Sequence, residues 1–124
     1  MHILIVEDEE IVSEILITRM KRWGQNVVLA TSCEEALSKI KTGRFDLVLL
    51  DIMLPDGLGY EVIPEIKQAL PNINIITMTG DNTPDLERTV RAFGITYFMA
   101  KPVDFDELKN IIDHIANKQK RKVA

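Results

Sequence analysis

The chain has 124 residues, of which 46% are apolar and 27% are charged, and its net charge is −4. This balance is typical of one globular domain and excludes a disordered or collagen-like chain. An acidic domain is a poor binder of nucleic acid or of an anionic membrane, and no apolar run approaches the roughly 20 residues that span a bilayer. The single cysteine, Cys33, cannot form an intrachain disulfide, so we expect a protein of the reducing cytoplasm.

Five short apolar runs recur along the chain. They are continuous rather than alternating, which is typical of strands covered on both faces in a parallel sheet. In chain order the predicted strands are Ile3–Val6, Val27–Ala30, Leu47–Leu50, Ile73–Met78 and Tyr97–Ala100.

Helical patterns fill the segments between these runs. A first helix follows the spacing from Ile11 to Trp23 and can end at Gly24. The later helices are predicted from the Ser32/Glu35 capping box, from Tyr60–Leu70 with Pro64 near its start, from the Thr83-Pro84 start, and from the Asp104/Glu107 cap. Five alternating units of strand and helix predict a parallel sheet with helices on both faces. We assign residues 1–117 to this domain and 118–124 to a basic C-terminal tail.

Polar residues stand where the predicted strands end. Glu7 and Asp8 follow the first strand, Asp51 the third, Thr79 the fourth and Lys101 the fifth. In such sheets ligands bind beyond the carboxyl ends of the strands, so these side chains are expected in one crevice. Because close carboxylates repel one another, Lys101 and a hard cation such as Mg²⁺ are the natural compensation. A carboxylate beside Mg²⁺ and a lysine can attack phosphorus to form an aspartyl-phosphate.

The ordered set Glu7-Asp8, Asp51, Thr79 and Lys101-Pro102 resembles the receiver domain of two-component response regulators. The match covers residues 2–117 and includes Pro55-Asp56-Gly57 in the loop after Asp51. The resemblance implies an α/β fold of the flavodoxin-like type: a doubly wound (βα)5 parallel sheet with strand order 2-1-3-4-5 in a three-layer sandwich.

The resemblance also implies a role for each acidic residue. Asp51 would be the phospho-acceptor. Asp8 and Asp51 would bind Mg²⁺ together with the backbone carbonyl of Met53, and Glu7 would act through a water. Glu7 stands where many members have Asp, which is a common variant.

Three further residues receive roles by the same resemblance. Lys101 and Thr79 would each bind a phosphoryl oxygen, and Thr79 with Phe98 would form the switch pair. The Lys101-Pro102 bond is usually cis in the family. Gly80 departs from the family pattern, in which alanine is usual after the threonine, so the loop that follows Thr79 is expected to be looser.

These roles imply a signalling switch and not an enzyme that turns over an external substrate. A histidine kinase or phosphotransfer protein would donate the phosphoryl group. The surface of the fourth helix, the fifth strand and the last helix would then address an output domain or a downstream protein, with a homodimer possible on phosphorylation.

Two alternatives use the same residues. A phosphatase of the haloacid dehalogenase type also has a strand-end aspartate and Mg²⁺, but it needs a second aspartate where Met53 stands. A degenerate receiver would serve only for protein contacts, and the complete set of site residues argues against it.

Overall fold

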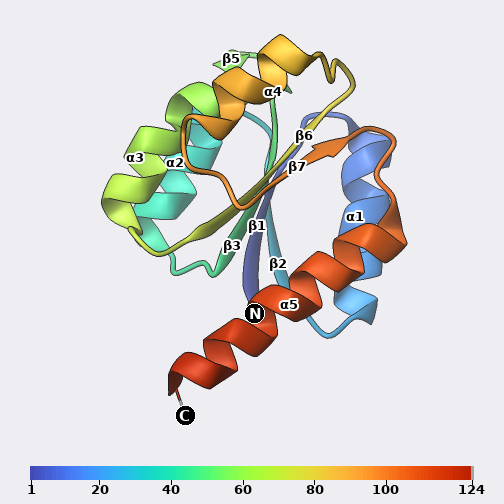
Figure 1. Ribbon diagram of the computed structural model, residues 1–124, viewed down its shortest axis with the longest axis vertical. Coiled ribbons are helices and arrows are strands. Elements are labelled where there is room, and N and C mark those ends of the chain that lie inside the picture. Colours follow the sequence, from blue (N-terminus) through green and yellow to red (C-terminus); the bar gives the residue numbers. More distant parts are fainter. Residues whose placement is uncertain (124) are drawn as a thin grey trace.

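The main sheet has five parallel strands in the order β2-β1-β3-β6-β7. The computed structural model describes residues 1–123 (Figure 1). The strands are β1 (His2–Val6), β2 (Asn26–Ala30), β3 (Leu47–Asp51), β6 (Asn74–Thr79) and β7 (Tyr97–Ala100). Numbered within this sheet alone, the order is 2-1-3-4-5, so the predicted flavodoxin-like fold is confirmed.

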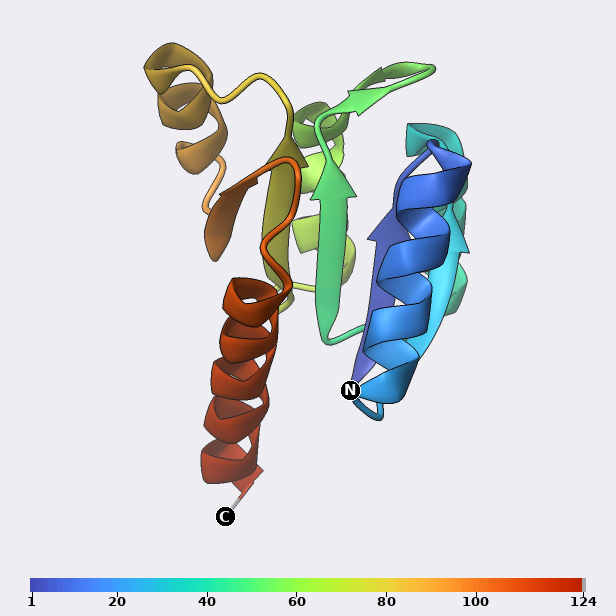
Figure 2. The same cartoon turned by 90° about the vertical axis from the view of Figure 1, so that its right-hand side faces the viewer.

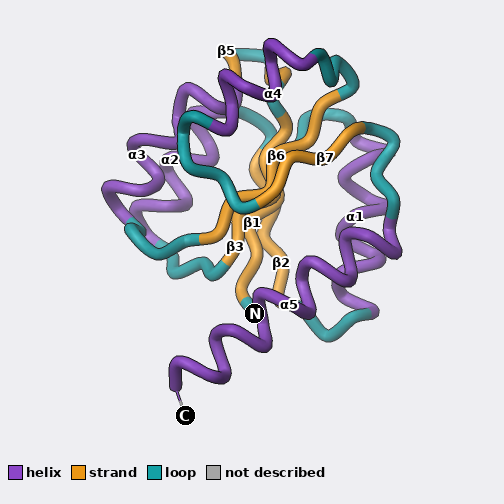
Figure 3. Tube along the Cα trace, in the orientation of Figure 1, coloured by secondary structure: helices purple, strands orange, loops and turns teal. Residues whose placement is uncertain are grey.

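Helices cover both faces of this sheet (Figures 2 and 3). One face carries α1 (Glu10–Arg22) and α5 (Phe105–Val123). The other carries α2 (Cys33–Thr42), α3 (Ile63–Ala69) and α4 (Pro84–Arg91). Among the residues that the structure describes, no helix is both long and apolar enough to cross a bilayer.

The core lies in two layers because successive side chains of a strand point to opposite faces. In β3, Leu47 and Leu49 pack toward α1 and α5, whereas Val48 and Leu50 pack toward α2 and α3. All four side chains are fully buried. The first polar residue of this strand is Asp51, at its last position.

Most of the predicted helix starts are present. The Ser32 hydroxyl accepts a hydrogen bond from the Glu35 N–H (3.1 Å), and the Thr83 hydroxyl accepts one from the Leu86 N–H (3.2 Å). Asp104 accepts bonds from the N–H groups of residues 106 and 107. Each cap satisfies donors that have no partner within the helix.

Two helices differ in extent from the prediction. The segment expected as one helix over Tyr60–Leu70 begins instead with a 3-10 turn, Gly59–Val62, and α3 follows from Ile63. Pro64 lacks an N–H, so it fits the first turn of α3 but not a helix interior. The helix α5 continues to Val123, through residues that we assigned to the basic tail.

A small hairpin that was not among the predicted elements follows β3. It consists of β4 (Met53–Leu54) and β5 (Gly57–Leu58), joined by Pro55 and Asp56. The Asp56 carboxylate accepts hydrogen bonds from the N–H groups of Cys33 (2.9 Å) and Glu34 (3.0 Å) at the start of α2. The chain then returns so closely to β3 that a Cβ at Gly59 would collide with the Asp51 carbonyl oxygen.

Asp56 makes the stability of the fold depend on pH. Its two backbone hydrogen bonds, from Cys33 and Glu34, lower the pKa of the carboxyl group. The stabilisation is therefore present above the unfolded pKa of about 3.9 and is lost as pH falls through the lowered pKa of the folded state. We expect Asp56→Asn to lower the urea midpoint at pH 7 and to differ less from the wild type at pH 3. Ser32→Ala is the matched control, because its hydroxyl cap does not titrate and its loss of about 1 kcal/mol should be similar at both pH values. A difference for Asp56→Asn that does not change with pH would contradict this account.

Candidate functional site

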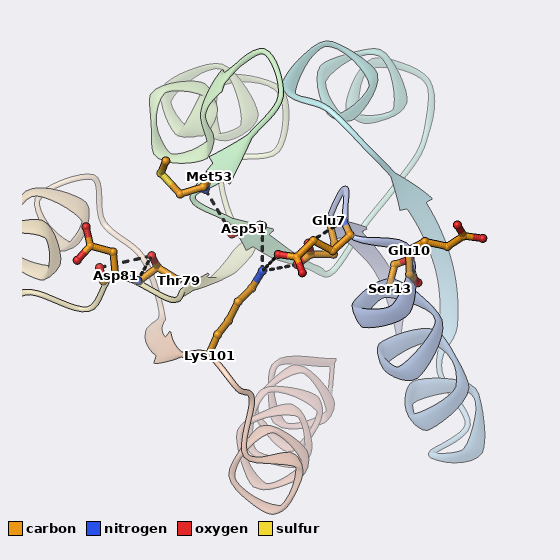
Figure 4. Close-up of polar contacts among 9 residues, drawn as sticks. Glu7, Glu10, Ser13, Asp51, Met53, Thr79, Asp81 and Lys101 are labelled. Carbon is orange, nitrogen blue, oxygen red and sulfur yellow. Dashed lines mark hydrogen bonds and ion pairs between the residues drawn. The ribbon is translucent and has the colours of Figure 1, made fainter.

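The carboxyl ends of β1, β3 and β7 bring four of the predicted residues together. Three of them, Glu7, Asp51 and Lys101, are labelled in Figure 4. Glu7 and Asp8 follow β1, Asp51 ends β3, and Lys101 follows β7. One carboxylate oxygen from each of the three acids lies within 4.8 Å of the others. Glu7 and Asp51 are buried, whereas Asp8 is exposed. The cluster therefore has a buried floor and one side open to solvent.

A single ammonium group lies among these carboxylates. Lys101 Nζ is 2.8 Å from Glu7 Oε2 and 3.0 Å from Asp51 Oδ2. It is also 3.7 Å from the exposed carboxylate of Glu9. Only 16% of the lysine side chain is exposed. Lys101 thus bridges the two buried acids directly.

Burial and mutual repulsion act on the protonation of these groups. Burial raises the pKa of Glu7, the Asp51 charge adds to that rise, and the nearby Lys101 ammonium group opposes it. Burial alone would lower the pKa of Lys101, but its close contacts with the carboxylates of Glu7 and Asp51 outweigh burial and raise it. Lys101 is therefore a stable cation at neutral pH. When all three acids are ionised, one lysine leaves the cluster with a charge of −2.

The residues fit a hard divalent cation that takes oxygen ligands. Glu7 Oε2 is buried, and although it lies close to Lys101 it receives no well-aligned hydrogen bond from the described residues. In an octahedral shell with metal–oxygen distances of about 2.0–2.1 Å, ligand oxygens lie roughly 2.9–4.2 Å apart. The spacing of the three acids is compatible with such a shell. The negative charge of the cluster also favours a divalent ion.

Thr79 and Phe98 lie inside the protein beside this cluster. The Thr79 hydroxyl is buried and accepts a hydrogen bond from the Asp81 N–H (3.0 Å), which closes the turn after β6. Its own donation to the Asp81 carbonyl oxygen is long, at 3.4 Å. Phe98 is 8% exposed and packs against Ile52 and Val90 beneath α4. The two predicted switch residues therefore face the same layer of the sheet without touching Asp51 through a hydrogen bond.

Two more residues stand in the loops that follow β3 and β6, Met53 and Asp81 (Figure 4). Met53 donates its backbone N–H to Asp51 Oδ1 (3.3 Å), while its side chain is 60% exposed. Asp81, also exposed, follows Thr79. The Lys101-Pro102 peptide bond is cis, as predicted. The Lys101 N–H bonds to the Thr79 carbonyl oxygen (2.8 Å), which joins the ends of β6 and β7.

Two residues near the site were given no role in it by the sequence prediction. The exposed carboxylate of Glu9 approaches Lys101 at 3.7 Å. Asp56 was visible as part of a Pro-Asp-Gly turn, but its partners Cys33 and Glu34 lie 22–23 residues earlier in the chain. Only the folded arrangement reveals that the turn reaches α2.

The fold and this cluster define a class of signalling domain. The family model of the response regulator receiver domain matches residues 3–113. The chain belongs to this family and is a receiver domain of two-component response regulators.

Curated relatives and solved structures agree with this assignment. The chain is 36% identical to the transcriptional regulatory protein ZraR of Klebsiella oxytoca, over 86% of this chain and 24% of the relative. It is 34% identical to the transcriptional regulatory protein CitT of Bacillus subtilis, over 98% of this chain and 54% of the relative. A CheY-like receiver domain protein from Methanospirillum hungatei superposes with a TM-score of 0.88 at 28% identity, over 97% of both chains. The chain thus spans about a quarter to a half of the length of these curated relatives.

The geometry of the cluster predicts which acid contributes most to the affinity for Mg²⁺. We expect Asp8→Ala to weaken Mg²⁺ binding roughly tenfold or more, because it removes one of few direct oxygen ligands. Glu9→Ala is the matched control, since it removes a neighbouring carboxylate that lies outside the group of three acids. Titration with Mg²⁺ followed by NMR measures both affinities. Equal losses in the two variants would mean that the acids attract the ion only as a diffuse charge.

Proposed function

We propose that Asp51 accepts a phosphoryl group from the phosphohistidine of a histidine kinase or phosphotransfer protein. The observation that carries this proposal is the position of Asp51 at the end of a central strand, 3.0 Å from Lys101 and within the group of three acids. A carboxylate oxygen of Asp51 forms the new O–P bond as the P–N bond to the donor imidazole breaks, and the electron pair of that bond stays on the imidazole nitrogen. Asp8, Asp51, the Met53 carbonyl and, through a water, Glu7 would hold Mg²⁺. The ion supplies neutralisation of charge on the transferring oxygens.

Lys101 is the residue of this protein that neutralises negative charge on the incoming phosphoryl group. Its ammonium group already lies beside Asp51, so no rearrangement is needed to place a positive charge next to an incoming phosphoryl oxygen. The two buried acids hold this lysine in place, since it lies within 3.0 Å of each of them. Replacement of Lys101 would leave both acids without their shared counter-charge.

Thr79 provides the link from the phosphoryl group to the surface. Its long bond to the Asp81 carbonyl is easily exchanged for a stronger bond to a phosphoryl oxygen. Movement of the hydroxyl toward Asp51 would alter the space available to Phe98 beneath α4. The outcome is a shift in population, which only a partner that prefers one state can detect.

The partners follow from two surfaces. Beside the site, Ile11 and Ile15 of α1 are 74% and 45% exposed, and their spacing of four residues places them on one face of the helix. A groove of about 430 Å³ between α1 and Pro102 lies next to them, and this apolar surface suits a helical phosphodonor.

The surface of α4, β7 and α5 would signal to an output domain or a downstream protein, and a homodimer on phosphorylation would use it as well. The names of the curated relatives, transcriptional regulatory proteins, support an output that controls transcription.

The acceptor is tested with a small phosphodonor. We expect acetyl phosphate and Mg²⁺ to add one phosphoryl group to the wild type and none to Asp51→Asn, because the amide is a far weaker nucleophile than the carboxylate. Asp85→Asn, which changes an exposed aspartate in α4, is the control and should be modified like the wild type. Intact-mass spectrometry gives the answer. A phosphoryl group mapped to another residue would overturn the proposal, and no modification of the wild type would favour a degenerate receiver.

The lifetime of the phosphorylated state depends on the residues that border the approach of water. Met53 is exposed beside Asp51 and offers water no strong hydrogen bond, so it crowds the attacking water without orienting it. Asp81 can orient a water, but its charge lies near an anionic phosphoryl group. We judge that the missing polar group at Met53 dominates and that the wild type loses its phosphoryl group slowly.

Met53→Asn is therefore expected to speed this hydrolysis several-fold, where a factor of ten corresponds to only about 1.4 kcal/mol of barrier. The measurement is the decay of Asp51-phosphate after removal of the donor at constant Mg²⁺. Val28→Asn, an exposed substitution on the edge strand β2, serves as the control. Decay at the wild-type rate or more slowly in Met53→Asn would refute the argument about water and leave the assignment of the acceptor intact.

A further inference from the structure

The hairpin of β4 and β5 borders the phosphorylation site, yet it is too small to be stable alone. It contains two residue pairs, Met53 with Leu58 and Leu54 with Gly57. A two-stranded hairpin is marginal in water even when it is longer than this. Its position must therefore come from contacts with the rest of the protein. At its base, the Gly59 N–H bonds to the Ile52 carbonyl oxygen (2.6 Å), and Leu54 and Leu58 pack against the core.

Asp56 is the one polar side chain of the hairpin, and it attaches the tip of the hairpin to α2. The two carboxylate oxygens take separate donors, Oδ1 from Cys33 and Oδ2 from Glu34, at 2.9 and 3.0 Å. Both donors are N–H groups in the first turn of α2, where a negative charge is favoured by the helix dipole. Hydrogen bonds to an ionised acceptor are also stronger than those between neutral groups. The lowered pKa of Asp56 agrees with this geometry.

The helix α2 already has a cap of its own. Ser32 accepts the Glu35 N–H, which is the third donor of the first turn. The Ala36 N–H is bonded to the Ser32 carbonyl oxygen. Ser32 therefore stabilises the start of α2 without any contact to the hairpin. What Asp56 adds is a connection between this helix and the loop that follows the acceptor strand.

We propose that Asp56 is a positioning residue of the phosphorylation site, which fixes the β4–β5 hairpin against α2 and thereby holds Met53 in place. The inference rests on the proposed function, in which the Met53 carbonyl is a ligand of Mg²⁺. Met53 begins the hairpin, and its N–H already bonds to Asp51 at 3.3 Å. When the tip of the hairpin is released, both backbone groups of Met53 lose their fixed orientation toward Asp51. The β4–β5 hairpin beside Mg²⁺ and Asp51 is then less ordered.

The test compares Asp56→Ala with Ser32→Ala, because both remove a cap from the same helix and only the first releases the hairpin. All measurements are made on the full chain well below the unfolding temperature. They are Mg²⁺ affinity by NMR, hydrogen exchange of the hairpin amides, and the rate of modification by acetyl phosphate. We expect Asp56→Ala to weaken Mg²⁺ binding several-fold, to speed amide exchange over residues 53–58 and to slow modification. Ser32→Ala should leave all three close to the wild type.

Asp56→Asn keeps one acceptor and should lie between Asp56→Ala and the wild type, which provides a second reading if the alanine variant folds poorly. Equal effects of Asp56→Ala and Ser32→Ala, or unchanged exchange and Mg²⁺ affinity in Asp56→Ala, would overturn the inference and reduce Asp56 to a helix cap. The proposed function fails separately, when the wild type itself takes no phosphoryl group on Asp51. Faster hairpin exchange and weaker Mg²⁺ binding confined to the Asp56 variants would still support the positioning role in that case.

Discussion

The arrangement of the site depends on one electrostatic constraint: several carboxylates meet at the end of a buried sheet with a single lysine to compensate them. Glu7 and Asp51 are inside the protein, where water cannot screen them, and Lys101 bridges the two within 3.0 Å. The remaining negative charge is retained because the acids are held at the ends of two neighbouring strands, β1 and β3, and cannot move apart. The repulsion among the acids favours the binding of a cation. The fold alone produces this repulsion, without a bound partner.

The loops around the cluster differ in how firmly they are held. The hairpin after β3 is attached at its base through Gly59 and at its tip through Asp56. The turn after β6 is closed by the Thr79 hydroxyl and is followed by Gly80, which is exposed and has no side chain to pack. One side of the acceptor is thus bounded by an anchored loop and the other by a loop with fewer restraints. Conformational change is expected on the side of Thr79, since low-stability segments are where proteins open first.

The sequence predicted those features that have a local physical cause. Continuous apolar runs such as Leu47–Leu50 indicate strands buried on both faces, and the side chains of Ser32 and Thr83 cap helices whose donors lie only three residues away. The convergence of Glu7, Asp51 and Lys101 followed from one rule, that parallel strands end at the same edge. The tie between Asp56 and α2 has no local signal, because its donors are remote in the chain. The third helix was predicted from Tyr60 with Pro64 near its start, but the α-helix begins only at Ile63, after a 3-10 turn that the apolar spacing does not distinguish from a helix.

The strand that ends in Asp51 is also the centre of the sheet. Its residues pair with β1 on one side and with β6 on the other, and Asp51 itself lies opposite Met78. A slip of one position along β3 would exchange the side chains of the two core layers, and would move the acceptor carboxylate at the same time. Insertions and deletions in this strand are therefore excluded by packing, independently of any selection for phosphorylation. The position of Asp51 is therefore fixed by the packing of β3. The lifetime of the phosphorylated state and the choice of partner depend instead on the surrounding loops and helix surfaces, which this packing does not constrain.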